Sequence, residues 1–380
     1  MKNVMNKKEI NEIKSLFDTV QDAGIRRLAG CYVNGEKQKV KTFVDAFLNL
    51  PEEEMYKYLE IFRRTFSGTQ GKNLLDMSFD EKDGVSEGRT LLKRLRDSDL
   101  DDEEALNEFF DKVIANYEYV GNYLILLINQ DYDVPNITTD GIEMEDASEE
   151  VYRYILCSIC PMKLTKPGLG FDDDLGEIHT LKQIFAVDLP DTGFLFPAYN
   201  DRSSDEDAAL YFTRKTDEQQ EKLLENVLNL SFTIPAKQQK EDFTGLVNEV
   251  LGDEKSFETV FAIQENLKEA VKNKKQEAPG ETVVIDRKEI KNIFEDSGVS
   301  EEKLKTFDEK YEKRFDREEI VAENVAPVRN FEVKNANMVL RVSSKRTDII
   351  ETKIVDGKKC LVIELTDDLT VNGIPVKDNQ

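Results

Sequence analysis

The sequence predicts an α+β fold: a mixed sheet with flanking helices, followed by a short helix pair and a small β-hairpin unit. Strand-like and helix-like apolar spacings alternate through the first 275 residues. A polar segment with Pro279-Gly280 then separates this body from a different pattern. Turn signals at Asp356-Gly357 and Asn372-Gly373 indicate hairpins near the end. We therefore expect a main body at 1–275, a linker at 276–282, a helix pair at 283–320 and a β unit at 321–380.

Helices are predicted where apolar residues recur every three to four positions behind a start signal. The first begins near Asn6, carries Ile10, Ile13 and Phe17 on one face, and ends before Gly24. Pro51, followed by three glutamates, opens the second, because proline suits the first turn and acids face the helix dipole. Further helices are expected over 86–96, 102–117, 217–230, 234–252, 256–275, 286–296 and 300–315.

Strands are predicted at short runs rich in β-branched and aromatic residues. The run 122–129 is apolar without alternation, which is typical of a central strand buried on both faces. Pro197 places its strand at an edge or a bulge, because proline cannot donate to a ladder. The expected strands are 25–33, 39–47, 74–79, 122–129, 151–164, 192–199 and 208–214, with short ones from 331 to 376.

The composition is strongly acidic, with 77 Asp and Glu against 52 Lys and Arg in 380 residues and a formal charge of -25. This charge disfavours nucleic acid and anionic membranes, which are bound by Lys and Arg, and permits a basic protein partner. Four cysteines suit a reducing compartment, and the densest apolar run, 123–128, is far shorter than the ~20 residues of a membrane span. We expect a soluble, cytoplasmic protein without a membrane segment.

Acidic residues after the apolar run 122–129 suggest one catalytic alternative. Asp131 and Asp133 would lie at the exposed end of a buried strand, where carboxylates bind Mg²⁺ or Mn²⁺ in phosphoryl-transfer enzymes. Asp201, or the run Asp172–Asp174, would complete the site. The substrate phosphate would then be met by Lys166 and Arg202, with Lys163 as a further candidate. The simpler interpretation of Asp-Tyr-Asp-Val-Pro, and the favoured one, is a turn, because Asp bonds its own backbone and Pro fixes φ.

The cysteines and the single histidine give weaker evidence for a catalytic or metal site than the acidic residues do. Cys157 and Cys160 have redox spacing, but their apolar neighbours predict a buried strand rather than a helix N-terminus, where a thiol pKa is lowered. One histidine, His179, excludes zinc sites that need two or three histidines from the chain. The sequence gives no reason to pair His179 with either cysteine as a nucleophile and base.

Two further patterns resemble known motifs without matching them. The loop Ser67 to Asn73 has only two residues between its glycines and no hydroxyl after Lys72, so it fails the phosphate-loop pattern. The pair 286–296 and 300–315 is spaced like a helix-turn-helix, but its second helix lacks a basic face. We expect Leu304, Phe307, Tyr311 and Phe315 to form an ordinary packing stripe.

Several strings together resemble the bacterial family catalogued as domain of unknown function 4317. They are GCYVNGEK from Gly30, SGTQGKNLLDMSF from Ser67, GNYLILLINQDYDVP from Gly121, YILCSICPMKLTKPGL from Tyr154 and GFLFPAYNDR from Gly193. The resemblance runs from Met5 to about Val376. It implies a bacterial cytoplasmic protein with one shared architecture, and it implies no activity, cofactor or catalytic residue.

Because each catalytic pattern fails on spacing or on residue supply, the sequence favours a non-catalytic cytoplasmic binding or regulatory protein acting through protein contacts, with no cofactor. The first alternative is a metal-dependent hydrolase of a phosphate ester, with Asp131, Asp133 and Asp201 as ligands and Lys166 and Arg202 on the substrate. The second is an acidic mimic of nucleic acid. The binding function requires an exposed apolar patch or groove of several hundred Å², whereas the hydrolase requires the three carboxylates to converge.

Overall fold

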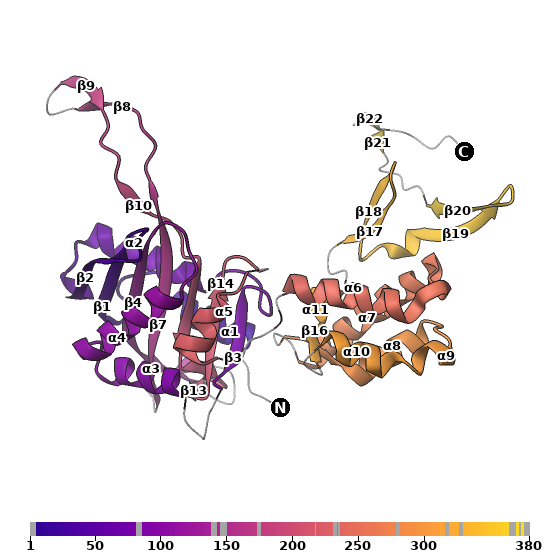
Figure 1. Cartoon of the computed structure of the whole chain (residues 1–380), viewed down its shortest axis with the longest axis horizontal. Helices are drawn as coiled ribbons and strands as arrows, with labels where there is room; N and C mark the ends of the chain where they lie inside the picture. Colours follow the sequence, from indigo (N-terminus) through magenta and orange to yellow (C-terminus); the bar gives the residue numbers. More distant parts are fainter. Residues whose placement is uncertain are drawn as a thin grey trace.

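The computed structural model shows three successive parts, which we call the sheet unit (5–230), the helical unit (236–326) and the C-terminal hairpins (330–375) (Figure 1). The fold is α+β, as predicted. The structure describes residues 5–80, 86–137, 143–144, 150–172, 176–216, 218–230, 234, 236–278, 282–315, 319–326, 330–364, 370–371 and 374–375. No helix among these residues is both long and apolar enough to cross a membrane.

One large sheet organises the sheet unit, with strands in the order β2-β1-β4-β7-β11-β14-β3 and β10 pairing with β7. Every described ladder in it is antiparallel, whereas we had expected a mixed sheet. Its strands are β1 (Ile25–Val33), β2 (Lys39–Ala46), β3 (Leu74–Ser78), β4 (Asn122–Val134), β7 (Glu150–Leu164), β10 (Phe185–Val187), β11 (Thr192–Phe196) and β14 (Ala208–Thr213). The small pairs β5 (Asn136–Ile137) with β6 (Glu143–Met144) and β12 (Ala198–Asn200) with β13 (Ser203–Asp205) adjoin it.

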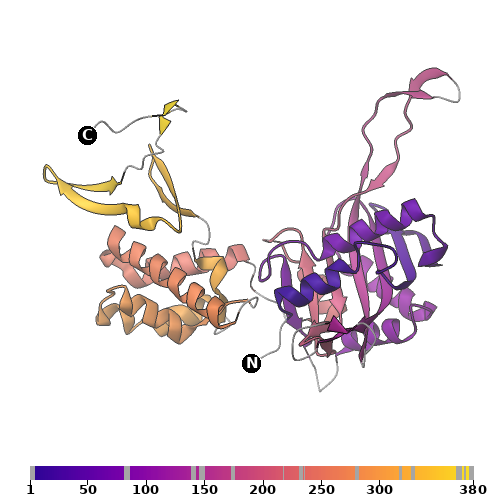
Figure 2. The ribbon, with the colours of Figure 1, turned by 180° about the vertical axis from the view of Figure 1, so that it is seen from behind.

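Helices cover both faces of this sheet, which explains why β4 is apolar without alternation. On one face α3 (Glu87–Asp97) and α4 (Glu103–Asn116) share a core with Ile125 and Leu127. This core includes α5 (Glu221–Leu223) and the π-helical turn Leu224–Leu228. On the other face Leu124 and Leu126 pack with α1 (Lys7–Ser15) and α2 (Glu52–Thr65), which lie over the sheet in the view from behind (Figure 2). The turn Phe47–Asn49 leads into α2.

Short-range sequence signals fix several helix starts. Asn6 forms a capping box with Glu9, and Asp286 forms one with Glu289. Ser86, Asp102 and Ser256 each accept a backbone N–H at the start of their helices. The first helix ends at Ser15, earlier than the predicted end just before Gly24.

The helical unit has its own core, contributed by elements on both sides of the expected linker. Phe243 and Leu246 of α6 and Leu267 of α7 pack with Phe294 and Phe307. The elements before and after the expected linker 276–282 therefore share one core, and residues 279–281 of that linker lie outside the described residues. The elements are α6 (Ala236–Leu251), the turn Gly252–Glu254, α7 (Phe257–Glu277), β15 (Val284–Asp286), α8 (Arg287–Asp296), α9 (Glu301–Leu304), α10 (Phe307–Arg314), β16 (Glu319–Val321) and α11 (Ala322–Val325).

The C-terminal hairpins rest on α7. Phe331 meets the rings of Phe257 and Phe261, at 6.5 and 5.1 Å between centroids, and Glu258 accepts a hydrogen bond of 2.8 Å from Thr352. The hairpins pair β17 (Asn330–Lys334) with β18 (Val339–Ser343), β19 (Ile350–Val355) with β20 (Lys358–Ile363), and β21 (Thr370–Val371) with β22 (Ile374–Pro375). A short turn, Thr347–Ile349, precedes β19. Asp356 and Gly357 form the β19–β20 turn as predicted.

Candidate functional site

Asp131 lies inside β4 rather than after it, and its carboxylate is already paired. Arg153 donates from Nε at 2.9 Å, and Arg26 donates to the second oxygen. The hydrogen bond with Asp131 raises the pKa of the Arg153 guanidinium. Only 17% of the Asp131 side chain is exposed, and both of its carboxylate oxygens already accept from arginines.

The third proposed ligand, Asp201, does not lie with Asp131 and Asp133. Asn129 donates to the Arg96 carbonyl of α3 and Tyr132 donates to Glu12 of α1, so odd-numbered positions of this part of β4 face α3. Asp131 and Asp133 share that face. Asp201 instead sits in the β12–β13 turn at positive φ, near Glu9 of α1. Within the described residues no group of three or more His, Cys, Asp or Glu is arranged to hold a metal.

The two proposed substrate contacts are also separated. Arg202 donates to Glu12 at 3.0 Å and to the Pro135 carbonyl at 2.9 Å, which fixes its guanidinium beside α1. Lys166 is exposed on the segment that follows β7. Of the acidic run after it, Asp173 and Asp174 lie outside the described residues. The structure therefore places Asp131 and Asp133 on one face of β4, Asp201 and Arg202 together in the β12–β13 turn, and Lys166 on the segment after β7, so the five residues do not form one site.

Cys157 and Cys160 lie in the middle of β7, as the sequence predicted, and both are fully buried. They are three positions apart in an unbroken ladder, so their side chains project to opposite faces of the sheet. Burial raises the pKa of both thiols well above the usual value. His179 is exposed on a distant strand, β9 (Glu177–Thr180), which excludes a shared nucleophilic site.

The two segments that resemble known motifs, the loop Ser67 to Asn73 and the helix pair, make contacts within the fold. In the loop Ser67 to Asn73, the Asn73 amide accepts from Thr69 N–H at 3.1 Å and donates to the carbonyl of Thr213 at 3.0 Å. In the helix pair, Leu304, Phe307, Tyr311 and Phe315 are all buried in the helical unit, as predicted.

A long β-ribbon projects from the sheet at the far end of β7, and we call residues 164–189 the arm (Figure 1). At its end β8 (Leu169–Asp172) pairs with β9. Nearer the sheet, β10 returns along Met162 to Leu164. Leu169, Phe171 and Ile178 expose 74, 62 and 70% of their surface.

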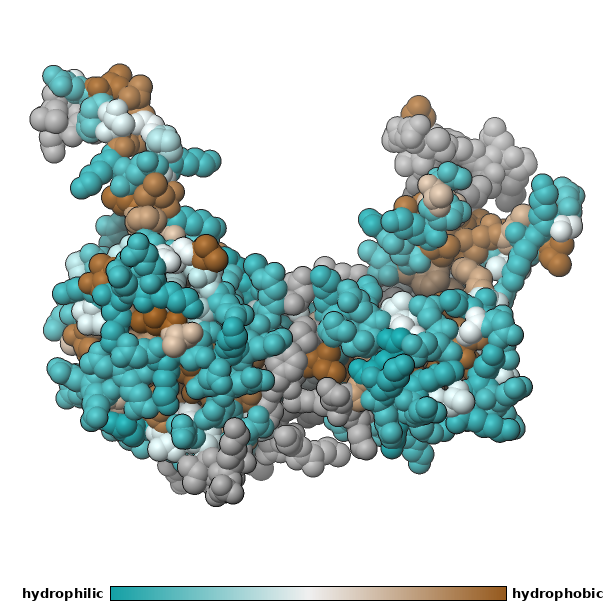
Figure 3. All heavy atoms as spheres, viewed as in Figure 1, coloured by the Kyte–Doolittle hydropathy of each residue, from teal (hydrophilic) through white to brown (hydrophobic). Residues whose placement is uncertain are grey.

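Apolar exposure is concentrated on the arm. Figure 3 shows apolar residues gathered at its end and again toward its base. The large hydrophobic residues exposed there are Leu164, Leu169, Phe171, Ile178, Leu181, Ile184, Phe185, Val187 and Leu189. Single exposed apolar residues need no explanation, but a group on one projecting element is typical of an interaction surface.

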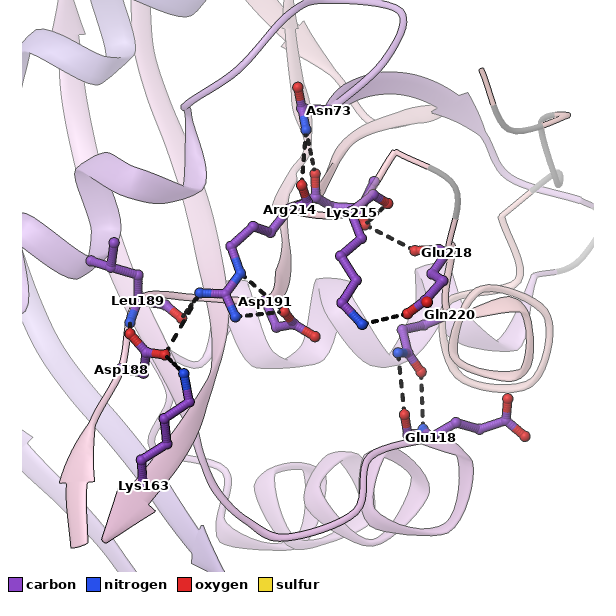
Figure 4. A network of polar contacts seen from close by, with 11 residues as sticks. Asn73, Glu118, Lys163, Asp188, Leu189, Asp191, Arg214, Lys215, Glu218 and Gln220 are labelled. Atoms are coloured by element: carbon purple, nitrogen blue, oxygen red, sulfur yellow. Dashed lines mark hydrogen bonds and ion pairs between the residues drawn. The ribbon is translucent and has the colours of Figure 1, made fainter. Parts of the chain in front are cut away.

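Ion pairs fix the base of the arm to the sheet (Figure 4). Asp188 binds Lys163 of β7 and lies 3.8 Å from the Arg214 guanidinium that follows β14. Arg214 also pairs with Asp191 at 2.9 Å and donates to the Leu189 carbonyl at 3.4 Å. The hydrogen bond from Lys163 holds the pKa of Asp188 below its usual value. The arm therefore leaves the sheet in a defined direction.

A second feature is a groove of about 1070 Å³ formed where the sheet unit, the helical unit and β17 meet. Its lining is partly aromatic: Phe257 and Phe261 stack at 5.6 Å between centroids, Phe331 meets both rings, and Phe243 also lines the groove. Pockets of this size and character commonly bind ligands or side chains of a partner.

The groove is basic, although the chain as a whole is acidic. Its lining includes two acidic residues, Glu323 and Glu332, against five lysines, a surplus of three positive charges. The lysines are Lys72, Lys237, Lys240, Lys255 and Lys334. Such a local reversal of charge selects for an anionic occupant.

Sequence reasoning missed both features. The arm had a signal, since 164–189 combines apolar residues with Gly168, Gly170 and Gly176 and no helical spacing. The groove had none, because its lining comes from positions between 72 and 334.

The chain belongs to the family described as Domain of unknown function (DUF4317), whose profile matches residues 5–374. No curated protein matches the chain, and no solved structure matches it.

Proposed function

We propose that this family member is a non-catalytic binding protein of the bacterial cytoplasm that acts through protein contacts, and that its arm is the surface engaged by a partner. The observation that carries the proposal is the concentration of exposed apolar side chains on one anchored, projecting element. Its acidic composition supports a soluble protein that avoids nucleic acid.

The energetics favour contact through the arm. Burying one large aliphatic or aromatic side chain contributes about 1.5–3 kcal/mol. Leu169, Phe171 and Ile178 alone therefore offer a partner several kcal/mol. Since Asp188, Lys163 and Arg214 already fix the arm base, less conformational entropy is lost on binding.

The test is a photo-crosslinking amino acid placed at Phe171 or Ile178 in cells of the source organism. Leu48 is the matched control position, because it is equally exposed, at 70%, and lies outside the arm. We expect a discrete protein adduct from the arm positions that is competed by excess wild-type protein and not by the Phe171→Asp variant. No discrete adduct from either arm position, or an equal adduct from Leu48, would contradict the proposal.

A further inference from the structure

We infer that the groove receives the arm of a second copy of this chain, so that two copies associate by exchanging arms. This inference rests on the proposed function of the arm and names its partner.

The end of the arm has the chemistry that the groove selects. Between Lys166 and Lys182 the arm sequence contains four acidic residues, Asp172, Asp173, Asp174 and Glu177, of which Asp173 and Asp174 lie outside the described residues. Leu169, Phe171 and Ile178 expose their side chains in the same stretch. The described strands β8 and β9 thus display apolar side chains away from the body of the molecule.

The groove offers the complementary surface. The aromatic part of its lining, with Phe257, Phe261 and Phe331, suits apolar side chains. Lys240 and Lys334 lie among its five lysines and suit carboxylates. Opposite charges around an apolar contact give both affinity and orientation.

A second copy is the occupant because the arm cannot turn back to its own groove. Both ribbon views show the arm leaving the sheet away from the helical unit (Figures 1 and 2). The Asp188 pairs with Lys163 and Arg214 hold that direction. In a two-fold dimer each arm meets the partner's groove, so one contact forms twice and the assembly closes.

The salt dependence of dimerisation provides one test of the inference. Two chains of -25 repel each other overall, and added salt would screen that repulsion and strengthen association. Added salt would instead weaken the attraction between the arm carboxylates and the groove lysines. Because these two effects oppose each other, we expect added salt to weaken the wild-type dimer more than a Lys240→Glu dimer, which retains the overall repulsion and lacks one groove lysine.

The experiment is sedimentation velocity on the purified full chain, with expected masses of 43.6 kDa for the monomer and twice that for the dimer. Phe171→Asp on the arm and Lys240→Glu in the groove should each raise the dimer dissociation constant at least tenfold. Leu48→Asp and Lys57→Glu, at exposed positions outside both surfaces, should leave it unchanged.

Mixing the two variants distinguishes dimerisation by arm exchange from other modes of dimerisation. A Phe171→Asp chain keeps a wild-type groove, and a Lys240→Glu chain keeps a wild-type arm. Their mixture therefore retains one intact contact and should dimerise more strongly than either variant alone. A dimer that ignores both substitutions, or a mixture no stronger than its parts, would overturn the inference.

The outcomes also distinguish the inference from the proposed function. A wild-type chain that stays monomeric at about 100 µM, where contacts with smaller dissociation constants are populated, would overturn arm exchange. If Phe171 still gave a discrete crosslinked adduct of another mass, the arm would remain a protein-binding surface with a different partner. If it gave none, both proposals would fall.

Discussion

The Asn324 side chain donates from Nδ2 to the carbonyl oxygen of Gly71 at 3.3 Å, across 253 positions of the chain. The same group donates to Gln239 Oε1 at 3.0 Å, and that oxygen also accepts from Val321 N–H at 3.1 Å. Asn324 is buried, and these bonds join the loop after α2 to α6 and α11. The contact lies beside the groove, which Asn324 also lines.

Substituting Gly71 tests this junction. Gly71 has φ +74°, and a Cβ there would stand 3.0 Å from Val321 Cγ1 and 3.1 Å from Thr282 Cγ2. Gly71→Ala should therefore lose about 1–2 kcal/mol from backbone strain and a further ~1 kcal/mol or more from overpacking. Gly298→Ala is the control, because Gly298 has φ +82° with nothing within 4 Å. Equal losses in urea unfolding followed by circular dichroism would show that the junction is not tightly packed.

Asp131→Asn tests the ion-paired carboxylate of β4. The substitution removes the charge that Arg26 and Arg153 share, so we expect unfolding free energy to fall by about 1 kcal/mol. Asp133→Asn, at an exposed position two residues along, should change it by less than about 0.5 kcal/mol. We expect Mg²⁺ and Mn²⁺ to leave the Tm of the wild-type chain unchanged. A Tm raised by either ion and lost in Asp131→Asn would instead support the hydrolase.

Asp76 predicts a pH dependence of stability. Its carboxyl accepts from Met5 N–H at 3.0 Å, and burial raises its pKa from 3.8 to about 7. The folded state therefore binds a proton that the unfolded state has released, and this stabilisation is lost as pH rises through 7. Between pH 5 and 8, Asp76→Asn should gain on the order of 2 kcal/mol relative to wild type, because one pKa unit corresponds to about 1.4 kcal/mol.

The measurement is urea unfolding of both proteins at several pH values. Asn keeps the oxygen that accepts from Met5 N–H and cannot ionise, so the comparison isolates the effect of Asp76 protonation on the free energy of unfolding. A difference between the two proteins that stays constant from pH 5 to 8 would contradict the raised pKa.

The thiols should differ sharply in reactivity. Cys31, Cys157 and Cys160 are fully buried, and burial raises the pKa of Cys31 to about 11. Cys360 is partly exposed. We expect a thiol reagent to modify one cysteine quickly in the native chain and four after unfolding, because the thiolate must reach solvent to react. Cys360→Ser should abolish the fast phase, and a fast phase that persists would mean that the β7 thiols open to solvent.

The sequence by itself determined the local elements and the α+β class. The apolar run 122–129 predicted a strand buried on both faces, and helices on both sides of β4 confirm it. Cap residues such as Ser86 and Asp102 marked helix starts within a residue or two. These features are readable because capping and periodicity depend on neighbours within a few positions.

Only the tertiary structure decided the strand directions, the shared core of α6 to α10, and the two candidate surfaces. The sequence predicts Asp131 as an exposed acid after a strand. In the structure it lies within β4, and Arg153 on β7 and Arg26 on β1 neutralise its charge. The groove unites Lys72 with Lys334, and the arm stands clear because β7 extends past Ile159, where its ladder with β11 ends. Periodicity tells which face of an element is buried, but which distant segment buries it depends on long-range packing that no local pattern encodes.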